Sequence, residues 1–156
     1  MSNSENPFHV EDDINFHFED VSFDFPDTSV ISSWLKIAIS SNNKKLRSLN
    51  FIFCNDNYLH EMNVKYLDHD TLTDVITFTC SDDDKIEGDV FISIDRVREN
   101  AKEIDISFHN ELHRVMIHGV LHLLGLNDKT KADKANMTLN ENKLLSVLNG
   151  LMLDKN

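Results

Sequence analysis

The chain has 156 residues, of which 40% are hydrophobic, and a chain of this size suits one compact domain over residues 1–156. It contains no run of about eighteen apolar residues and does not start with a basic segment followed by an apolar one. We therefore expect neither a membrane span nor a secretory signal, and a soluble, cytoplasmic protein. The formal net charge of −12 argues against a polyanionic partner, although eight acidic residues lie within residues 1–27, which hold no lysine or arginine.

The first part of the chain predicts alternating strands and helices. Residues 14–20 alternate apolar and polar side chains, which is typical of a strand. Asp27 is a candidate N-cap for a helix that reaches about Ser41 and carries an apolar stripe. The next expected elements are a short strand at 50–54, a helix at 56–65, a strand at 75–80, an acidic turn at 82–84, a strand at 88–94 and a helix from about 95 to 104.

The second part of the chain predicts two further helices. One begins near Ser107 and is apolar around almost its whole circumference, so we expect it to be a buried central element. The last helix is expected from residues 138–141, because Thr138 and Glu141 have the spacing of a capping box. Together these elements predict a small mixed β-sheet covered by helices, of the α+β or α/β class.

The stretch from His118 to Asp128 contains three candidate metal ligands. His118 and His122 are four residues apart, so on a helix both imidazoles leave the same face. Gly125 allows the chain to turn back, and Asp128 can then bring an oxygen to the same ion. Three protein ligands leave one position open, as in catalytic zinc sites. The alternative is a chance pair of helical histidines followed by a surface acid.

A second histidine pair with the same spacing, His109 and His113, lies nine residues upstream of the first. Nine residues rotate a helix by about 180°, so we expect these two side chains on the opposite face, as solvated or edge residues. Cys54 and Cys80 are not part of a CxxC motif, and we expect them to be small buried residues rather than a disulfide.

Zinc bound by two imidazoles and a carboxylate activates water and polarises acyl or phosphoryl oxygens, so the motif favours a hydrolase. Helical zinc proteases place a glutamate directly after the first histidine, where this chain has Gly119, and this disfavours a peptidase. If the phosphoryl substrate is a nucleic acid, the candidate contacts to its phosphates are Arg96, Arg98, Arg114 and Lys129. The alternative for these cations is a solvated surface of mixed charge.

Three segments resemble the YbeY family of zinc-dependent endoribonucleases, which act in ribosomal RNA maturation. The motif from His118 to Asp128 is similar to the family's metal motif. Residues 66–78 are similar to its Tyr-Arg segment and the following strand, and residues 88–101 to its Gly-Asp-Ile strand and the next helix. The resemblance covers about residues 60–130. It implies a zincin-like α+β fold in a single metallohydrolase domain, with one Zn²⁺ per chain held by His118, His122 and Asp128.

Four positions depart from the family pattern. Asp128 stands where the family usually has its third histidine, and a carboxylate leaves the ion less positive. The family's arginine, lysine and proline upstream are replaced by Leu67, His69 and Leu72. Loss of the arginine removes a side chain suited to bidentate phosphate binding.

Other residues near these motifs have ordinary explanations. Thr73 and Asp74 precede a strand, where turn capping is favoured over a catalytic part. Glu111 lies seven residues before His118 on the same helix face, and it either orients a ligand or favours the helix N-terminus. The Gly-Asp pair at 88–89 is interpreted as a strand entry, and no residue stands out as a general base.

The residues and the resemblance together predict a cytoplasmic, metal-dependent, single-strand-specific endoribonuclease of ribosomal RNA processing. Its catalytic residues would be His118, His122 and Asp128, acting through the ion, and its partners a ribosomal RNA precursor and the ribosomal subunit or its proteins. One alternative is a metalloprotease of the zincin type. Another is a zinc-bound ribosome-assembly factor that cuts nothing, which the leucine at position 67 makes credible.

Overall fold

A computed structural model describes residues 14–25, 27–67, 73–79 and 84–154. The predictions that concern Cys80, His69, Leu72, most of the acidic turn and residues 1–13 lie outside this part. The elements are β1 (Ile14–Phe18), α1 (Thr28–Ser41), β2 (Lys45–Cys54), α2 (Asp56–Leu67), β3 (Val75–Thr79), β4 (Lys85–Ser93), α3 (Ile94–Glu103), α4 (Phe108–Leu123) and α5 (Lys131–Asp154). Within these ranges, none of the helices combines the length and the apolar character needed to cross a membrane.

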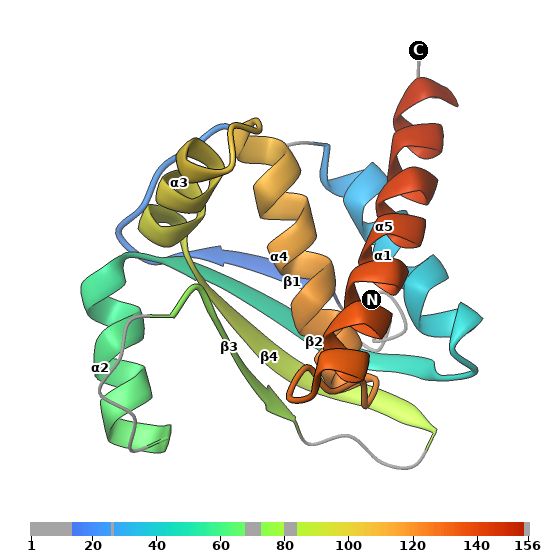
Figure 1. Ribbon diagram of the computed structural model, residues 1–156, viewed down its shortest axis with the longest axis horizontal. Helices are drawn as coiled ribbons and strands as arrows, with labels where there is room; N and C mark the ends of the chain where they lie inside the picture. The colour runs from blue at the N-terminus through green and yellow to red at the C-terminus, as the bar shows by residue number, and fades with distance from the viewer. Residues whose placement is uncertain (1–13, 26, 68–72, 80–83, 155–156) are drawn as a thin grey trace, which may run out of the picture.

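The four strands form one mixed sheet with the order β1-β2-β4-β3 (Figure 1). β1, β2 and β4 run parallel, and β3 pairs antiparallel with β4 at one edge. A small mixed sheet covered by helices confirms the predicted α+β class.

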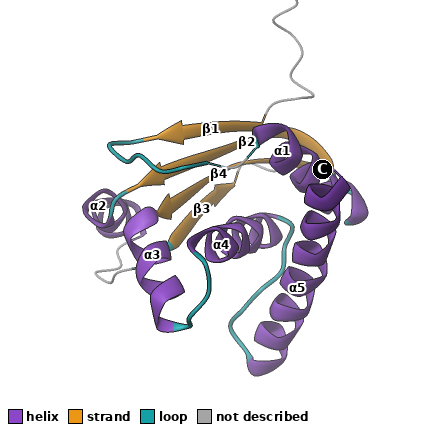
Figure 2. Cartoon of the chain, turned by 90° about the horizontal axis from the view of Figure 1, so that it is seen from above, coloured by secondary structure: helices purple, strands orange, loops and turns teal. Residues whose placement is uncertain are grey.

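The helix α4 is the central helix of the fold. Figure 2 shows it beneath the sheet, between α3 and α5. Its side chains pack into a core with Phe51 and Phe53 of β2, Val90 of β4 and Trp34 of α1, all of which are buried. Since α4 is enclosed by the sheet and three helices, the expectation of a buried central element is confirmed.

The helix α2 packs against the opposite face of the sheet, near the start of β3. Its Leu59 forms a second apolar cluster with Cys54 and Ile76. Burial raises the pKa of the Cys54 thiol to about 12, with smaller contributions from nearby carboxylates, so this side chain is a neutral thiol at ordinary pH. The expectation that Cys54 is a buried residue is therefore confirmed.

Two glycines allow α4 and the sheet to approach closely. A Cβ atom at Gly119 would lie 2.7 Å from Cγ1 of Val90, and one at Gly88 would lie 2.6 Å from the carbonyl oxygen of Phe78. Neither glycine can be replaced by a larger residue without a shift of its neighbours. Gly88 is thus an interior residue of β4 rather than a strand entry, because β4 begins at Lys85.

Two element boundaries differ most from those expected. β2 begins at Lys45 instead of residue 50, because its first half alternates exposed and half-buried residues at the sheet margin. α5 begins at Lys131, so the predicted capping box at 138–141 lies inside the helix. Thr130 and Asp133 form the reciprocal bonds instead: the Asp133 N–H donates to Thr130 Oγ1 at 3.0 Å and the Thr130 N–H to Asp133 Oδ2 at 3.4 Å.

The prediction that His113 is solvated is wrong. His113 is only 6% exposed, and its ring lies 6.0 Å from the Trp34 ring of α1, edge to face. The rotation of α4 places the upstream pair away from His118, as expected, but that face is covered by another helix. His109 is half-buried, with Nε2 2.6 Å from the carbonyl oxygen of Asp24.

Candidate metal centre

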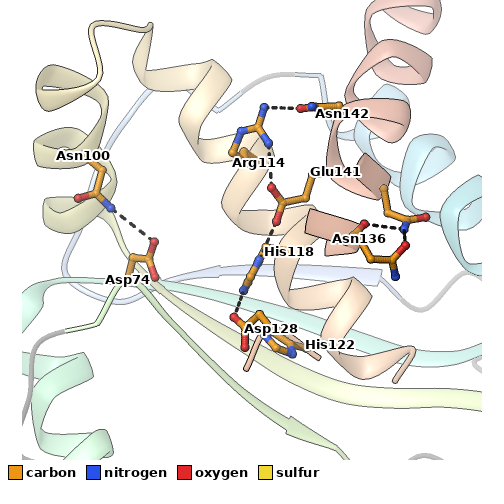
Figure 3. A network of polar contacts seen from close by, with 10 residues as sticks. Asp74, Asn100, Arg114, His118, His122, Asp128, Asn136, Glu141 and Asn142 are labelled. Atoms are coloured by element: carbon orange, nitrogen blue, oxygen red, sulfur yellow. Dashed lines mark hydrogen bonds and ion pairs between the residues drawn. The ribbon is translucent and has the colours of Figure 1, made fainter. Parts of the chain in front are cut away.

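The last turn of α4 and the loop that follows bring three ligand atoms together. His118 and His122 leave the same face of α4, with ring centroids 4.6 Å apart. Asp128 Oδ2 lies 3.4 Å from Nε2 of each histidine (Figure 3). The three ligand atoms lie within 4.8 Å of one another, and within the described ranges this is the only such group of metal-ligating residues.

A tight turn after α4 makes this convergence possible. Gly125 has a φ of +101°, and its N–H donates to the carbonyl oxygen of His122 at 2.9 Å. A left-handed backbone at this position favours glycine. The turn sends the chain back past the end of α4, so the predicted role of Gly125 is confirmed.

The three side chains remain partly accessible. The exposed fractions are 22% for His118, 28% for His122 and 41% for Asp128. Two imidazole nitrogens and one carboxylate oxygen match the donor set of catalytic zinc sites, in which a fourth position stays free. The residues present therefore fit a zinc ion with one side open to solvent or substrate.

Glu141 of α5 fixes the orientation of His118 through the Nδ1 side of the ring (Figure 3). Its Oε2 accepts a hydrogen bond of 2.7 Å from His118 Nδ1, so Nε2 faces Asp128. Its Oε1 accepts a hydrogen bond of 2.8 Å from Arg114, whose second nitrogen donates to Asn142 at 2.9 Å. Arg114 thereby fixes the Glu141 carboxylate, which in turn orients His118.

The ion pair of His118 and Glu141 shifts both pKa values toward the charged forms. Burial alone would lower the pKa of His118, but the hydrogen bond and charge of Glu141, with Asp128 and Asp74, raise it. Burial alone would raise the pKa of Glu141, but hydrogen bonds from His118 and Arg114 lower it. Glu141 is therefore an ionised acceptor. Because a histidine must lose its proton to bind a metal, protonation of His118 opposes metal binding.

Sequence analysis did not find Glu141 as a site residue. It lies thirteen positions beyond Asp128 and was assigned to a helix cap. The signal that was available is its place in the helix: Leu144 and Leu148 follow at three and seven residues, and all three are buried. An acid in an apolar stripe needs a buried partner.

Two neighbouring cavities open beside the triad. The larger, of 510 Å³, is lined by His118, His122 and Asp128 together with Asn63 and Leu67 of α2 and residues 73–77. The smaller, of 340 Å³, is lined by Asp74, Val75, Glu111, Arg114, Val115, His118, Asp128 and Glu141. Because His118 and Asp128 line both cavities, a substrate bound at the ion has room on two sides.

Asp74 faces both cavities from the start of β3. Burial raises the pKa of its carboxyl group, although its own N–H, the N–H of Val75 and the charge of His118 oppose this shift. Asn100 of α3 donates to Asp74 Oδ2 at 3.5 Å. Thr73 Oγ1 donates to the carbonyl oxygen of Val75 at 3.4 Å, which is the expected turn contact. Asp74 thus combines a turn position with a place beside the ligands.

Three of the four candidate phosphate contacts are engaged with other side chains. Arg96 is paired with Asp56, its Nε lying 3.2 Å from Oδ2, and the guanidinium of Arg98 lies 5.4 Å from the centre of the Phe108 ring. Among the described residues that line the two cavities, only Arg114 belongs to the predicted set. Lys129 is exposed and directly follows Asp128.

The fold and the site define a small α+β protein with a group of three candidate metal ligands at the end of a buried helix. The chain belongs to the endoribonuclease YbeY family, since the family model with the description Endoribonuclease YbeY matches residues 13–149. This confirms the resemblance seen in the sequence motifs.

Relatives with the same description are similar over most of their length. The Endoribonuclease YbeY of Amoebophilus asiaticus is 51% identical over 129 residues, which are 82% of this chain and 88% of the relative. The Endoribonuclease YbeY of Flavobacterium psychrophilum is 48% identical over 134 residues, or 86% and 95% of the two chains. The solution structure of TM1509 from Thermotoga maritima shares the fold, with a TM-score of 0.63, 23% identity and coverage of 91% of this chain and 93% of that one.

Proposed function

We propose that this protein is a zinc-dependent, single-strand-specific endoribonuclease that acts in the cytoplasm on ribosomal RNA precursors during ribosome maturation. The family description supports the nuclease activity. The observation that carries the metal dependence is the convergence of His118, His122 and Asp128 within 4.8 Å beside a 510 Å³ cavity. A zincin-like assignment of the fold and a single metallohydrolase domain over residues 1–156 are part of the same proposal.

The residues of the site suit hydrolysis of a phosphodiester. A bound zinc ion supplies an activated water and polarises a phosphoryl oxygen. Glu141 keeps the Nε2 lone pair of His118 available by accepting the Nδ1 proton. Asp74, whose pKa is raised by burial, can hold a proton on the wall that both cavities share.

A protease is a weaker candidate for this site. Gly119 packs against Val90, so the residue after the first ligand is directed at the sheet and leaves no room for a glutamate. The larger cavity, which His122 lines, has no glutamate in its described lining. The nuclease therefore agrees better with the geometry around Gly119.

Metal analysis and RNA cleavage test the proposal together. Protein purified without added ions is expected to hold one zinc per chain, and His122→Ala or Asp128→Ala to hold little. The wild-type protein is expected to cut a single-stranded RNA and to leave its duplex intact. Zinc content that is unchanged in Asp128→Ala would remove Asp128 from the ligand set, and intact RNA with a fully loaded protein would refute the nuclease.

A further inference from the structure

Glu111 is a buried carboxyl group without a complete set of partners. The residue is 6% exposed, and its Oε1 has no hydrogen-bond partner within the described part of the chain. Leaving a buried acceptor unpaired destabilises a fold. Glu111 is not needed as the N-cap, because Ser107 already caps α4 by accepting from the Asn110 N–H at 3.1 Å.

Glu111 lies on the wall of the 340 Å³ cavity, two helical turns from His118 and on the same face of α4. Burial raises the pKa of its carboxyl group, with a further contribution from Asp74, while Arg114 opposes the shift. The ionised form therefore lacks hydrogen-bond donors that water would give it. Rotation about the Cγ–Cδ bond is soft and can turn either oxygen toward the cavity.

The chemistry of the cavity limits what can bind there. The described carboxylates that line it, apart from Asp128, belong to no cluster able to hold a metal ion. A nucleobase normally stacks on aromatic rings, and His118 is the single aromatic residue in the described lining, whose apolar members are Val75 and Val115. The cavity instead suits a small polar group that donates a hydrogen bond.

The position of the cavity identifies the source of that donor. His118 and Asp128 line both cavities, as do Asp74 and Val75, so the group that enters the smaller one is bonded close to the phosphate at the ion. In RNA that group is the ribose, whose 2′-hydroxyl is a hydrogen-bond donor that DNA lacks.

We propose that Glu111 accepts a hydrogen bond from the ribose 2′-hydroxyl of the nucleotide held at the metal centre, so that the smaller cavity selects RNA over DNA. The proposal rests on the proposed function, because it requires a nucleic acid at the ion. It assigns Glu111 to substrate selection rather than to the folding of α4. Oε1 is buried in the free protein, so the carboxyl group turns toward the cavity when the hydroxyl binds.

The test compares an RNA and a DNA single strand of the same base sequence, bound to the zinc-loaded protein and measured by fluorescence anisotropy in the cold, with gels to show that the strands stay intact. The variants are Glu111→Leu, which removes both oxygens at similar volume, and Glu111→Gln, which keeps one acceptor. Asn110→Ala, at the exposed neighbouring position, is the control.

The wild-type protein is expected to bind the RNA about 10–100-fold more tightly than the DNA, as follows from one hydrogen bond to a charged acceptor. In Glu111→Leu the RNA affinity should fall to that of the DNA, while DNA affinity and zinc content stay unchanged. Glu111→Gln, which offers a neutral acceptor, should keep a preference of about 5-fold, and Asn110→Ala should keep all of it. Thermal unfolding of Glu111→Leu should occur at or above the wild-type temperature, because an unpaired buried acceptor is gone.

Three results would overturn the inference. In the first, Glu111→Leu still prefers RNA as the wild type does. In the second, it loses affinity for both strands equally, which indicates a structural role. In the third, replacing guanosine by inosine in the RNA abolishes the effect of Glu111→Leu on affinity, which would show that the donor is a base amino group and not the 2′-hydroxyl. A wild-type protein that holds zinc and binds no RNA would refute the proposed function itself.

Discussion

Removal of the Glu141 carboxylate should weaken zinc binding although Glu141 is not a ligand. The bond from His118 Nδ1 to Glu141 Oε2 is 2.7 Å long, and the side chains are 22% and 8% exposed. A hydrogen bond to a charged group contributes about 1.5–3 kcal/mol, and a neutral one about 1 kcal/mol. Glu141→Gln should therefore lower zinc affinity about 2–30-fold, and Glu141→Ala about 10–100-fold.

Competition of each variant with a zinc-binding dye at neutral pH measures the affinity directly. Lys143→Gln, two positions along α5 at an exposed side chain, is the matched control and should bind zinc as the wild type does. Urea unfolding of the metal-free proteins shows whether a variant is still folded. Wild-type zinc affinity in a folded Glu141→Ala protein would refute the positioning role, and an equal loss in Lys143→Gln would show that the effect is not specific to Glu141.

Three further perturbations test the fold and the site. Burial and the charge of His109 lower the pKa of His113 from 6.5 to about 4. As pH falls, the unfolded chain therefore binds a proton at His113 before the folded protein does, and the free energy of unfolding decreases. In urea unfolding, the wild type should lose about 2 kcal/mol more of its free energy of unfolding than His113→Phe does between about pH 7 and pH 5. Equal losses in the two proteins would contradict a link between stability and the protonation of His113. Gly119→Ala should lower the free energy of unfolding by about 1–3 kcal/mol, because the added Cβ atom overpacks Val90. Gly150→Ala, where a Cβ atom meets nothing within 4 Å, should instead stabilise α5 by about 0.5–1 kcal/mol. Equal unfolding midpoints for the two variants would refute the close approach of α4 to the sheet. Leu67→Arg places a guanidinium at the larger cavity and should tighten RNA binding in a salt-dependent way, and unchanged affinity at low salt would exclude phosphate contact from this position.

Local spacing was enough to predict that His118, His122 and Asp128 lie close together. The four-residue interval between His118 and His122 sets a common helix face, and the glycine at 125 allows the return of Asp128. Both relations act over about ten residues of chain, where helical geometry and turn chemistry decide the outcome. The same reasoning placed the N-cap at Asp27, which accepts from the N–H groups of Ser29 and Val30.

Contacts between distant segments were not accessible to that reasoning. Glu141 reaches His118 because α5 packs on α4, and Asp74 reaches the cavities because β3 lies at the sheet edge below the end of α4. The burial of His113 depends on Trp34, nearly eighty residues away in the chain. Periodicity tells which face of a helix is apolar, but not which element covers the other face.

The location of Glu141 on α5 separates the carboxylate that orients His118 from the element that carries both histidines. The orientation of the His118 ring therefore depends on the packing of α5 against α4. A perturbation that loosens this helix contact would disturb the histidine without touching any of the three candidate ligands.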